Sequence, residues 1–170
     1  IDLGGKKFNG IATGVTSYTG KHYKAGSGFV AGGTVKNLTA NNGMFKNLTA
    51  VLTVNYLTLD KAVITADKEA GCFIGKTTKD VTFNSVNVTN ATVGGTKFEG
   101  TSIGVGGFIG VVDGAANVNI YECKVNTATL KGHYYVGGFI GQVVNGGTIR
   151  LMGASGSKSD EVGTQADGLS

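Results

Sequence analysis

The sequence has no proline and no tryptophan, and only 15% of its 170 residues are charged. Thirty glycines without proline are unlike a disordered glycine-rich chain, because such chains normally carry proline and lack the 41% hydrophobic content found here. The glycines are therefore predicted to be structural. With so few charges, the surface must be covered by Thr, Asn, Ser and Gly, which suit strands and tight turns.

Other scarcities disfavour several classes of partner. No run of about 18 or more apolar residues occurs, so the sequence predicts no transmembrane helix. The net charge is +4, but the basic residues are scattered and not interleaved with aromatics, so we expect no nucleic-acid binding. The two cysteines and two histidines form no Cys-x-x-Cys or His-x-x-x-His pair, so we expect neither a metal site nor a cofactor.

A short marker, Gly-x-Phe-Ile-Gly, recurs along the chain. Its clear copies are residues 71–75, 106–110 and 137–141, and its weaker relatives are residues 28–30 and 43–45. With phenylalanine as the reference, the steps are 28 from Phe45 to Phe73, 35 to Phe108 and 31 to Phe139. These lengths suit one coil of a solenoid. The last three phenylalanines are predicted to stack inside it, and the glycines to allow positive φ and close approach between coils.

A second repeat follows each marker, with apolar or small residues at offsets 0, 2, 5, 7, 10 and 12 of a 13-residue segment. The three full copies are Leu52, Val54, Leu57, Leu59, Ala62, Ile64; Val81, Phe83, Val86, Val88, Ala91, Val93; and Val118, Ile120, Cys123, Val125, Ala128, Leu130. A fourth copy starts at Ile149 and stops after Ala154. Spacing of two indicates a strand, because side chains i and i+2 share a face, and a jump of three marks a bend.

These repeats predict a single-domain, right-handed parallel β-helix, a β-solenoid of about five coils spanning residues 31–155. The extra residues of the 35-residue step are placed in a loop at residues 94–100. Because the ends of a solenoid expose strand edges, residues 1–30 are predicted to form an N-terminal capping or edge segment. Residues 156–170 are predicted to form a polar C-terminal tail or cap.

The marker copies at residues 107–110 and 138–141, each followed by an alternating apolar segment, resemble the GLUG motif, a short repeat of bacterial cell-surface and secreted proteins. The resemblance covers roughly residues 43–155. The chain departs from the motif by carrying Phe where Leu is usual, and Cys72 replaces a glycine. The motif occurs in adhesin-like proteins and as an accessory region of larger secreted proteases, so it implies an extracellular or cell-surface setting and supplies no catalytic residue.

The cysteines were considered as nucleophiles paired with histidine. Cys123 shares its offset with Leu57 and Val86, which predicts a small core residue instead. Cys72 lies beside a phenylalanine of the marker and is expected in the core or at a corner. The two cysteines lie at different parts of the coil, so a disulfide between them is not expected.

Paired carboxylates would be needed for the acid and base chemistry of a polysaccharide-degrading β-helix. Equivalent outward positions carry Asp60, Thr89 and Asn126, so no acidic ladder forms there. Asp80 and Asp113 lie between marker and strand segment, where aspartate is typical of a tight turn.

Aromatic side chains in polar stretches are the remaining candidates for binding, because they can stack on sugar rings or anchor a protein partner. These residues are Tyr18, His22, Tyr23, His133, Tyr134 and Tyr135. The competing interpretation is that the first three belong to a capping segment and that one of Tyr134 and Tyr135 points inward.

Together these observations predict a non-catalytic, adhesin-like binding or structural module at a bacterial surface or in secretion, whose partner is a host or bacterial surface glycan or protein. The alternative is a carbohydrate-active β-helix or an accessory domain of a larger secreted enzyme.

Overall fold

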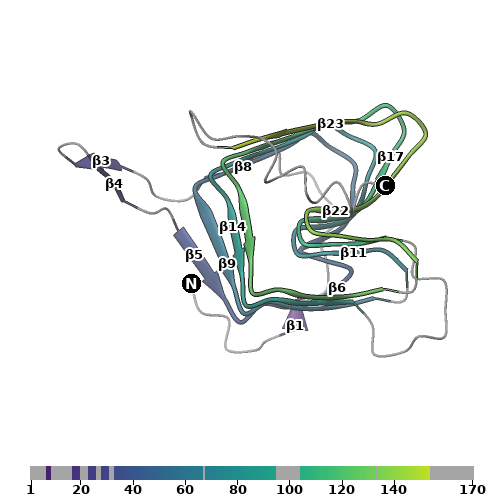
Figure 1. The fold of residues 1–170 in the computed structure, drawn as a ribbon, viewed down its shortest axis with the longest axis horizontal. Coiled ribbons are helices and arrows are strands. Elements are labelled where there is room, and N and C mark those ends of the chain that lie inside the picture. The colour runs from purple at the N-terminus through teal and green to yellow at the C-terminus, as the bar shows by residue number, and fades with distance from the viewer. Residues whose placement is uncertain are drawn as a thin grey trace.

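In the computed structural model, the described residues are 7–8, 17–19, 23–25, 28–30, 33–66, 68–94, 104–132 and 134–153, with side chains described from residue 33 onward. Every regular element among them is a β-strand. Viewed along the stack in Figure 1, successive coils nearly superimpose, and the chain folds back toward the middle of the outline at β11 and β22. The predicted all-β solenoid is confirmed.

Five parallel sheets form the walls, and each complete coil gives one strand to each sheet. We name each sheet by its strand among β9 to β13. The β9 sheet contains β5 (Gly33–Lys36), β9 (Leu57–Asp60), β14 (Asn87–Thr89) and β19 (Lys124–Asn126). The β10 sheet contains β1 (Lys7–Phe8), β6 (Thr39–Asn41), β10 (Val63–Thr65), β15 (Thr92–Gly94) and β20 (Thr129–Lys131).

The remaining walls follow in chain order. The β11 sheet contains β11 (Ala70–Gly71), β16 (Val105–Gly106) and β21 (Val136–Gly137). The β12 sheet contains β7 (Phe45–Leu48), β12 (Ile74–Thr77), β17 (Ile109–Asp113) and β22 (Ile140–Val144). The β13 sheet contains β2 (Ser17–Thr19), β8 (Leu52–Asn55), β13 (Val81–Asn84), β18 (Asn117–Tyr121) and β23 (Thr148–Met152).

The register of these sheets confirms the predicted inward positions. Leu52 pairs with Val81 and Val81 with Val118, so residues at offset 0 lie above one another. The same holds at offset 7, where Leu59 pairs with Val88. All six inward residues of the copy from Val81 to Val93 are buried. The inward side chains of successive coils therefore lie in rows and form one continuous apolar core. Burial of this core is the main source of the stability of the fold.

The jumps of three coincide with corners in the left-handed backbone region. Tyr56, Ser85 and Glu122, which precede strands of the β9 sheet, have φ of 53°, 51° and 52°. The next corner is similar, since Asn90 and Thr127 both have φ of 54°. A single left-handed residue turns the chain between two short strands without a longer loop, although it is unfavourable for most side chains.

The glycines of the three clear marker copies serve close approach rather than positive φ. At Gly71 an added Cβ would lie 2.5 Å from the carbonyl oxygen of Ile74 and 2.6 Å from that of Phe108. Gly71, Gly106 and Gly110 are outside the positive-φ region, so the prediction that marker glycines supply positive φ is wrong at these positions. The chain folds back on itself here, and only glycine lets the backbones approach so closely.

Two of the weaker marker copies were wrongly aligned. Phe45 pairs with Ile74, not with Phe73, so the first step is 29 residues and Met44 takes the place of the marker phenylalanine. Phe29 lies in β4 (Gly28–Val30), which forms an antiparallel hairpin with β3 (Tyr23–Ala25) and is no marker copy. The first error arises because main-chain pairing sets the register, while phenylalanine and isoleucine fill the same core equally well. The second arises because β4 pairs with β3 in a local hairpin.

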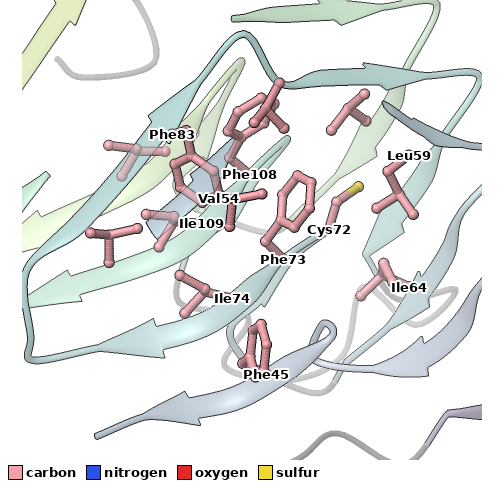
Figure 2. Close-up of a cluster of buried hydrophobic side chains, with 14 of the residues drawn as sticks. Phe45, Val54, Leu59, Ile64, Cys72, Phe73, Ile74, Phe83, Phe108 and Ile109 are labelled. Atoms are coloured by element: carbon pink, nitrogen blue, oxygen red, sulfur yellow. The ribbon is translucent and has the colours of Figure 1, made fainter. Parts of the chain in front are cut away.

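The predicted aromatic stack is present. The ring centroids of Phe73 and Phe108 are 5.3 Å apart and those of Phe108 and Phe139 are 5.2 Å apart, both in edge-to-face arrangements. Phe83, from the β13 sheet, adds a fourth ring 4.9 Å from Phe108. Figure 2 shows Phe73, Phe83 and Phe108 of this cluster with aliphatic side chains around them. Such pairs add about 0.5–1.5 kcal/mol each beyond burial, so the marker binds consecutive coils together.

Extra residues enter at two places without disturbing the register. Val93 pairs with Ile64, and Val105 pairs with Ala70. The segment from Val93 to Val105 is nevertheless six residues longer than the segment from Ile64 to Ala70. The sequence placed this insertion correctly. Two further residues enter between Val112 and Val118, in a turn containing Gly114 with φ of 74°.

Candidate binding surface

The turn between β20 and β21 and the first residue of β21 expose three consecutive large apolar residues, which we call the aromatic corner: Tyr134, Tyr135 and Val136. Their exposed fractions are 66%, 47% and 38%. The tyrosine ring centroids are 6.5 Å apart with planes tilted by 45°. The expectation that one tyrosine points inward is wrong, because these residues lie at a corner, where the inside-outside alternation of a strand does not apply.

The other predicted binding residues are described only in part. Tyr18 lies in β2, whose strand pairs with β8, and Tyr23 lies in the β3–β4 hairpin. Their side chains, and all of His22 and His133, lie outside the described residues. The structure therefore brings together Tyr134 and Tyr135 and leaves the proposed roles of the other four residues as predictions.

Four other exposed large apolar residues of the described chain, Val51, Val63, Val136 and Met152, are not among the predicted binding residues, and the last two lie at the end of the stack. Val136 belongs to the aromatic corner, and Met152, at the end of β23, is 53% exposed. Both belong to the last described coil. The sequence signal that could have found them is the end of the repeat after Ala154. No further coil of the same pattern follows, so residues of the last coil are expected to be more exposed than their equivalents in the interior.

The cysteines are chemically unsuited to nucleophilic work. Cys72 is fully buried beside Phe73, and this burial raises the pKa of its thiol far above the usual range. Burial likewise raises the pKa of Cys123 to about 12, and its Sγ donates to the carbonyl oxygen of Tyr121 at 3.1 Å. Both thiols are free and stay protonated at neutral pH, so they act as small core residues, as predicted for Cys123.

Carboxylates on the coil walls are held by hydrogen bonds from the neighbouring coil. Asp60 Oδ1 accepts from Asn90 Nδ2 at 3.0 Å and from Thr89 Oγ1 at 2.9 Å. These bonds, that from Asn90 foremost, lower the pKa of Asp60. A carboxylate with a lowered pKa is a poor proton donor near neutral pH, so Asp60 is suited to tying coils together.

The two turn aspartates also bond across coils, in agreement with the turn interpretation. Asp80 Oδ1 accepts from the backbone N–H of Asn117 at 2.8 Å. Asp113 Oδ2 lies 2.6 Å from Lys76 Nζ, and its Oδ1 accepts from Asn145 Nδ2 at 2.7 Å. The hydrogen bond from Lys76 is the main cause of a lowered pKa at Asp113. One carboxylate thus links three successive coils.

Uncharged polar side chains form similar links. Asn84 Nδ2 donates to Asn55 Oδ1 at 2.6 Å, and Ser85 Oγ donates to Glu122 Oε2 at 2.9 Å. Such side chains point outward from the β13 sheet and from its corner. Several polar side chains of the surface are therefore engaged in bonds along the stack.

Metal and membrane features are not found in the described part of the chain. It contains no group of three or more His, Cys, Asp and Glu side chains arranged to hold a metal ion. It also contains no helix with the length and apolar character needed to cross a bilayer. Comparison with known proteins returned no matching family model, no matching curated protein and no matching solved structure.

Proposed function

We propose that this chain is a non-catalytic binding module of a bacterial surface or secreted protein, which contacts a surface glycan or protein through the aromatic corner. The observation that carries the proposal is the exposure of Tyr134 and Tyr135 side by side on the last described coil. Tyrosine gives a large contact area at a low entropic cost, since the ring has only two rotatable side-chain bonds.

The surroundings support a role in contact rather than in chemistry. Asp60 and Asp113 have lowered pKa values, and the two cysteine thiols have raised ones. None of these four groups is therefore poised to exchange a proton or attack a substrate near neutral pH. The resemblance to the GLUG motif agrees with a surface or secreted setting.

The test is binding to a broad panel of glycans and matrix proteins, with hydrolysis and lyase assays on the same glycans. Replacing both tyrosines, as Tyr134→Ala with Tyr135→Ala, should weaken any binding by at least about tenfold, the usual effect of losing a central aromatic contact.

Met152→Ala is the matched control, because Met152 is exposed to a similar extent in the same coil but lies on the β13 sheet. It should leave binding unchanged. Equal losses in both variants would refute the aromatic corner as the contact site. Glycan turnover by the wild-type chain would favour the alternative, a carbohydrate-active β-helix.

A further inference from the structure

Asparagine followed by glycine occurs three times, at Asn9–Gly10, Asn42–Gly43 and Asn145–Gly146. In such a pair the glycine backbone nitrogen can attack the asparagine side-chain amide, because no side chain on the glycine obstructs the approach. The structure places the second and third pairs in opposite surroundings, and the first lies outside the described residues.

Asn145–Gly146 lies at the tip of the turn between β22 and β23, where both residues are exposed. A Cβ added to Gly146 would meet nothing within 4 Å, so the space around the glycine is open. The side-chain amide of Asn145 donates a hydrogen bond to the partly exposed carboxylate of Asp113 at the surface. Exposed hydrogen bonds of this kind open and close readily, which frees the amide to rotate.

Asn42–Gly43 is enclosed by contrast. Gly43 is buried, and a Cβ there would lie 2.4 Å from the carbonyl oxygen of Gly71 in the next coil. Asn42 Nδ2 donates to the carbonyl oxygen of Glu69 at 2.8 Å, a bond to backbone within the stack. A reaction that joins the Gly43 nitrogen to the Asn42 side chain would require the two coils to separate.

We propose that Asn145 is a site of spontaneous deamidation in the folded protein. The Gly146 nitrogen loses its proton and bonds to Cγ of Asn145, the Cγ–Nδ2 bond breaks, and ammonia leaves. The resulting five-membered succinimide is opened by water at either carbonyl, giving aspartate or isoaspartate. The net change consumes one water and releases one ammonia, and no oxidant, reductant or enzyme is needed.

The modification would alter the contact between the last two coils. Asn145 donates to Asp113, which also pairs with Lys76. A carboxylate in place of the amide has no proton to donate near neutral pH, and it adds a second negative charge beside Asp113. An attractive link is thus replaced by a repulsive one, and isoaspartate additionally lengthens the backbone of the turn.

The experiment incubates the purified full chain under native conditions at mildly alkaline pH and follows each Asn-Gly peptide by mass spectrometry. Asn145 should convert at least about tenfold faster than Asn42, because opening the packed coil costs more than about 1.4 kcal/mol. Chain held in denaturant is the reference, in which all three pairs should convert at similar rates.

Asn145→Gln keeps the amide but demands a less favourable six-membered ring, so it should abolish the modification of this peptide and leave the others unchanged. An intact Asn145 in folded protein, after the denatured chain has converted, would overturn the proposal, as would equal rates at Asn42 and Asn145. Asn145→Asp should melt below Asn145→Ser; equal melting temperatures would overturn the predicted repulsion.

Discussion

The two ends of the stack cover their apolar residues to different degrees. At the N-terminal end, Leu38, Ala40 and Phe45 are almost completely buried. At the C-terminal end, Leu130 is only partly buried although it lies in the same inward row as Ala40.

The pairing of the strands accounts for part of this difference. At the N-terminal end, β1 and β2 add rungs below β6 and β8. Along the described chain, the strands of the last coil pair on one side only. Most inward positions covered on both sides are therefore dry, whereas several in the last described coil are partly exposed, although Ile140 there is buried. The position in the stack, as well as the residue type, sets how much each side chain contributes.

The largest effect should separate an interior ring from a terminal one. Phe108→Ala removes a fully buried ring that contacts three others, so it should lower the free energy of unfolding by about 3–5 kcal/mol. Phe139→Ala removes a partly buried ring and should cost about half as much. Denaturant unfolding of both variants measures the difference, and equal losses would show that the last coil is as well packed as the interior.

A marker glycine between the last two coils should give the next largest effect. A Cβ at Gly106 would lie 2.7 Å from both the Gly141 nitrogen and the Phe139 carbonyl oxygen, so Gly106→Ala should cost about 3 kcal/mol. Gly114→Ala is the control, because a Cβ there meets nothing within 4 Å and only its φ of 74° is unfavourable. That variant should lose about 1 kcal/mol. Unfolding curves that rank the two variants the other way round would contradict a role in close approach.

A stabilising change is expected at a corner of the last coil. Thr127 is β-branched and has φ of 54°, whereas Asn37 and Asn90 occupy the same corner in other coils with φ of 56° and 54°. Asparagine tolerates this region better, so Thr127→Asn should raise the free energy of unfolding by about 0.5–1 kcal/mol. Thermal melting is the measurement, and a lower melting temperature would show that Thr127 makes a compensating contact.

The smallest effect should be the pH dependence of the link at Asp113. Its pKa is lowered in the folded chain from the ordinary value of 3.8, chiefly by the hydrogen bond from Lys76. The unfolded chain therefore binds the proton more readily than the folded chain. The stabilisation from ionised Asp113 is fully present above pH 3.8 and is lost as the pH falls through the lower pKa of the folded chain. Melting temperatures of wild type and Asp113→Asn should converge in acid. A difference in melting temperature between the two proteins that stays constant with pH would show that the charge of Asp113 contributes nothing and that hydrogen bonding alone stabilises this contact between coils.

The inward residues could be predicted from the sequence because strand alternation and the three-residue corner leave a pattern that no helix gives. Val81, Phe83 and Val88 lie where that pattern placed them. The partner of Phe45 could not be predicted, since aromatic and aliphatic residues are equally compatible with the interior and only main-chain pairing fixes the register.

The candidate site was predicted less well than the fold. Tyr134 and Tyr135 were found because aromatics are scarce in polar turns of this chain, but their orientation was missed. A corner has no periodicity from which the direction of a side chain follows. Val136, by contrast, is in register with the buried Ala70 and Val105, and it is exposed because it lies in the last described coil. Sequence patterns thus locate corner residues without showing which way they face.

The insertion between Val93 and Val105 shows that the length of a coil can change independently of the register of its strands. Coil length changes there by six residues, while the rungs on either side keep their partners. Loops of different length and composition could therefore be grafted at this edge without redesigning the interior. Such a chain offers evolution, and equally the protein engineer, a scaffold whose loops can vary while the paired rungs keep their register.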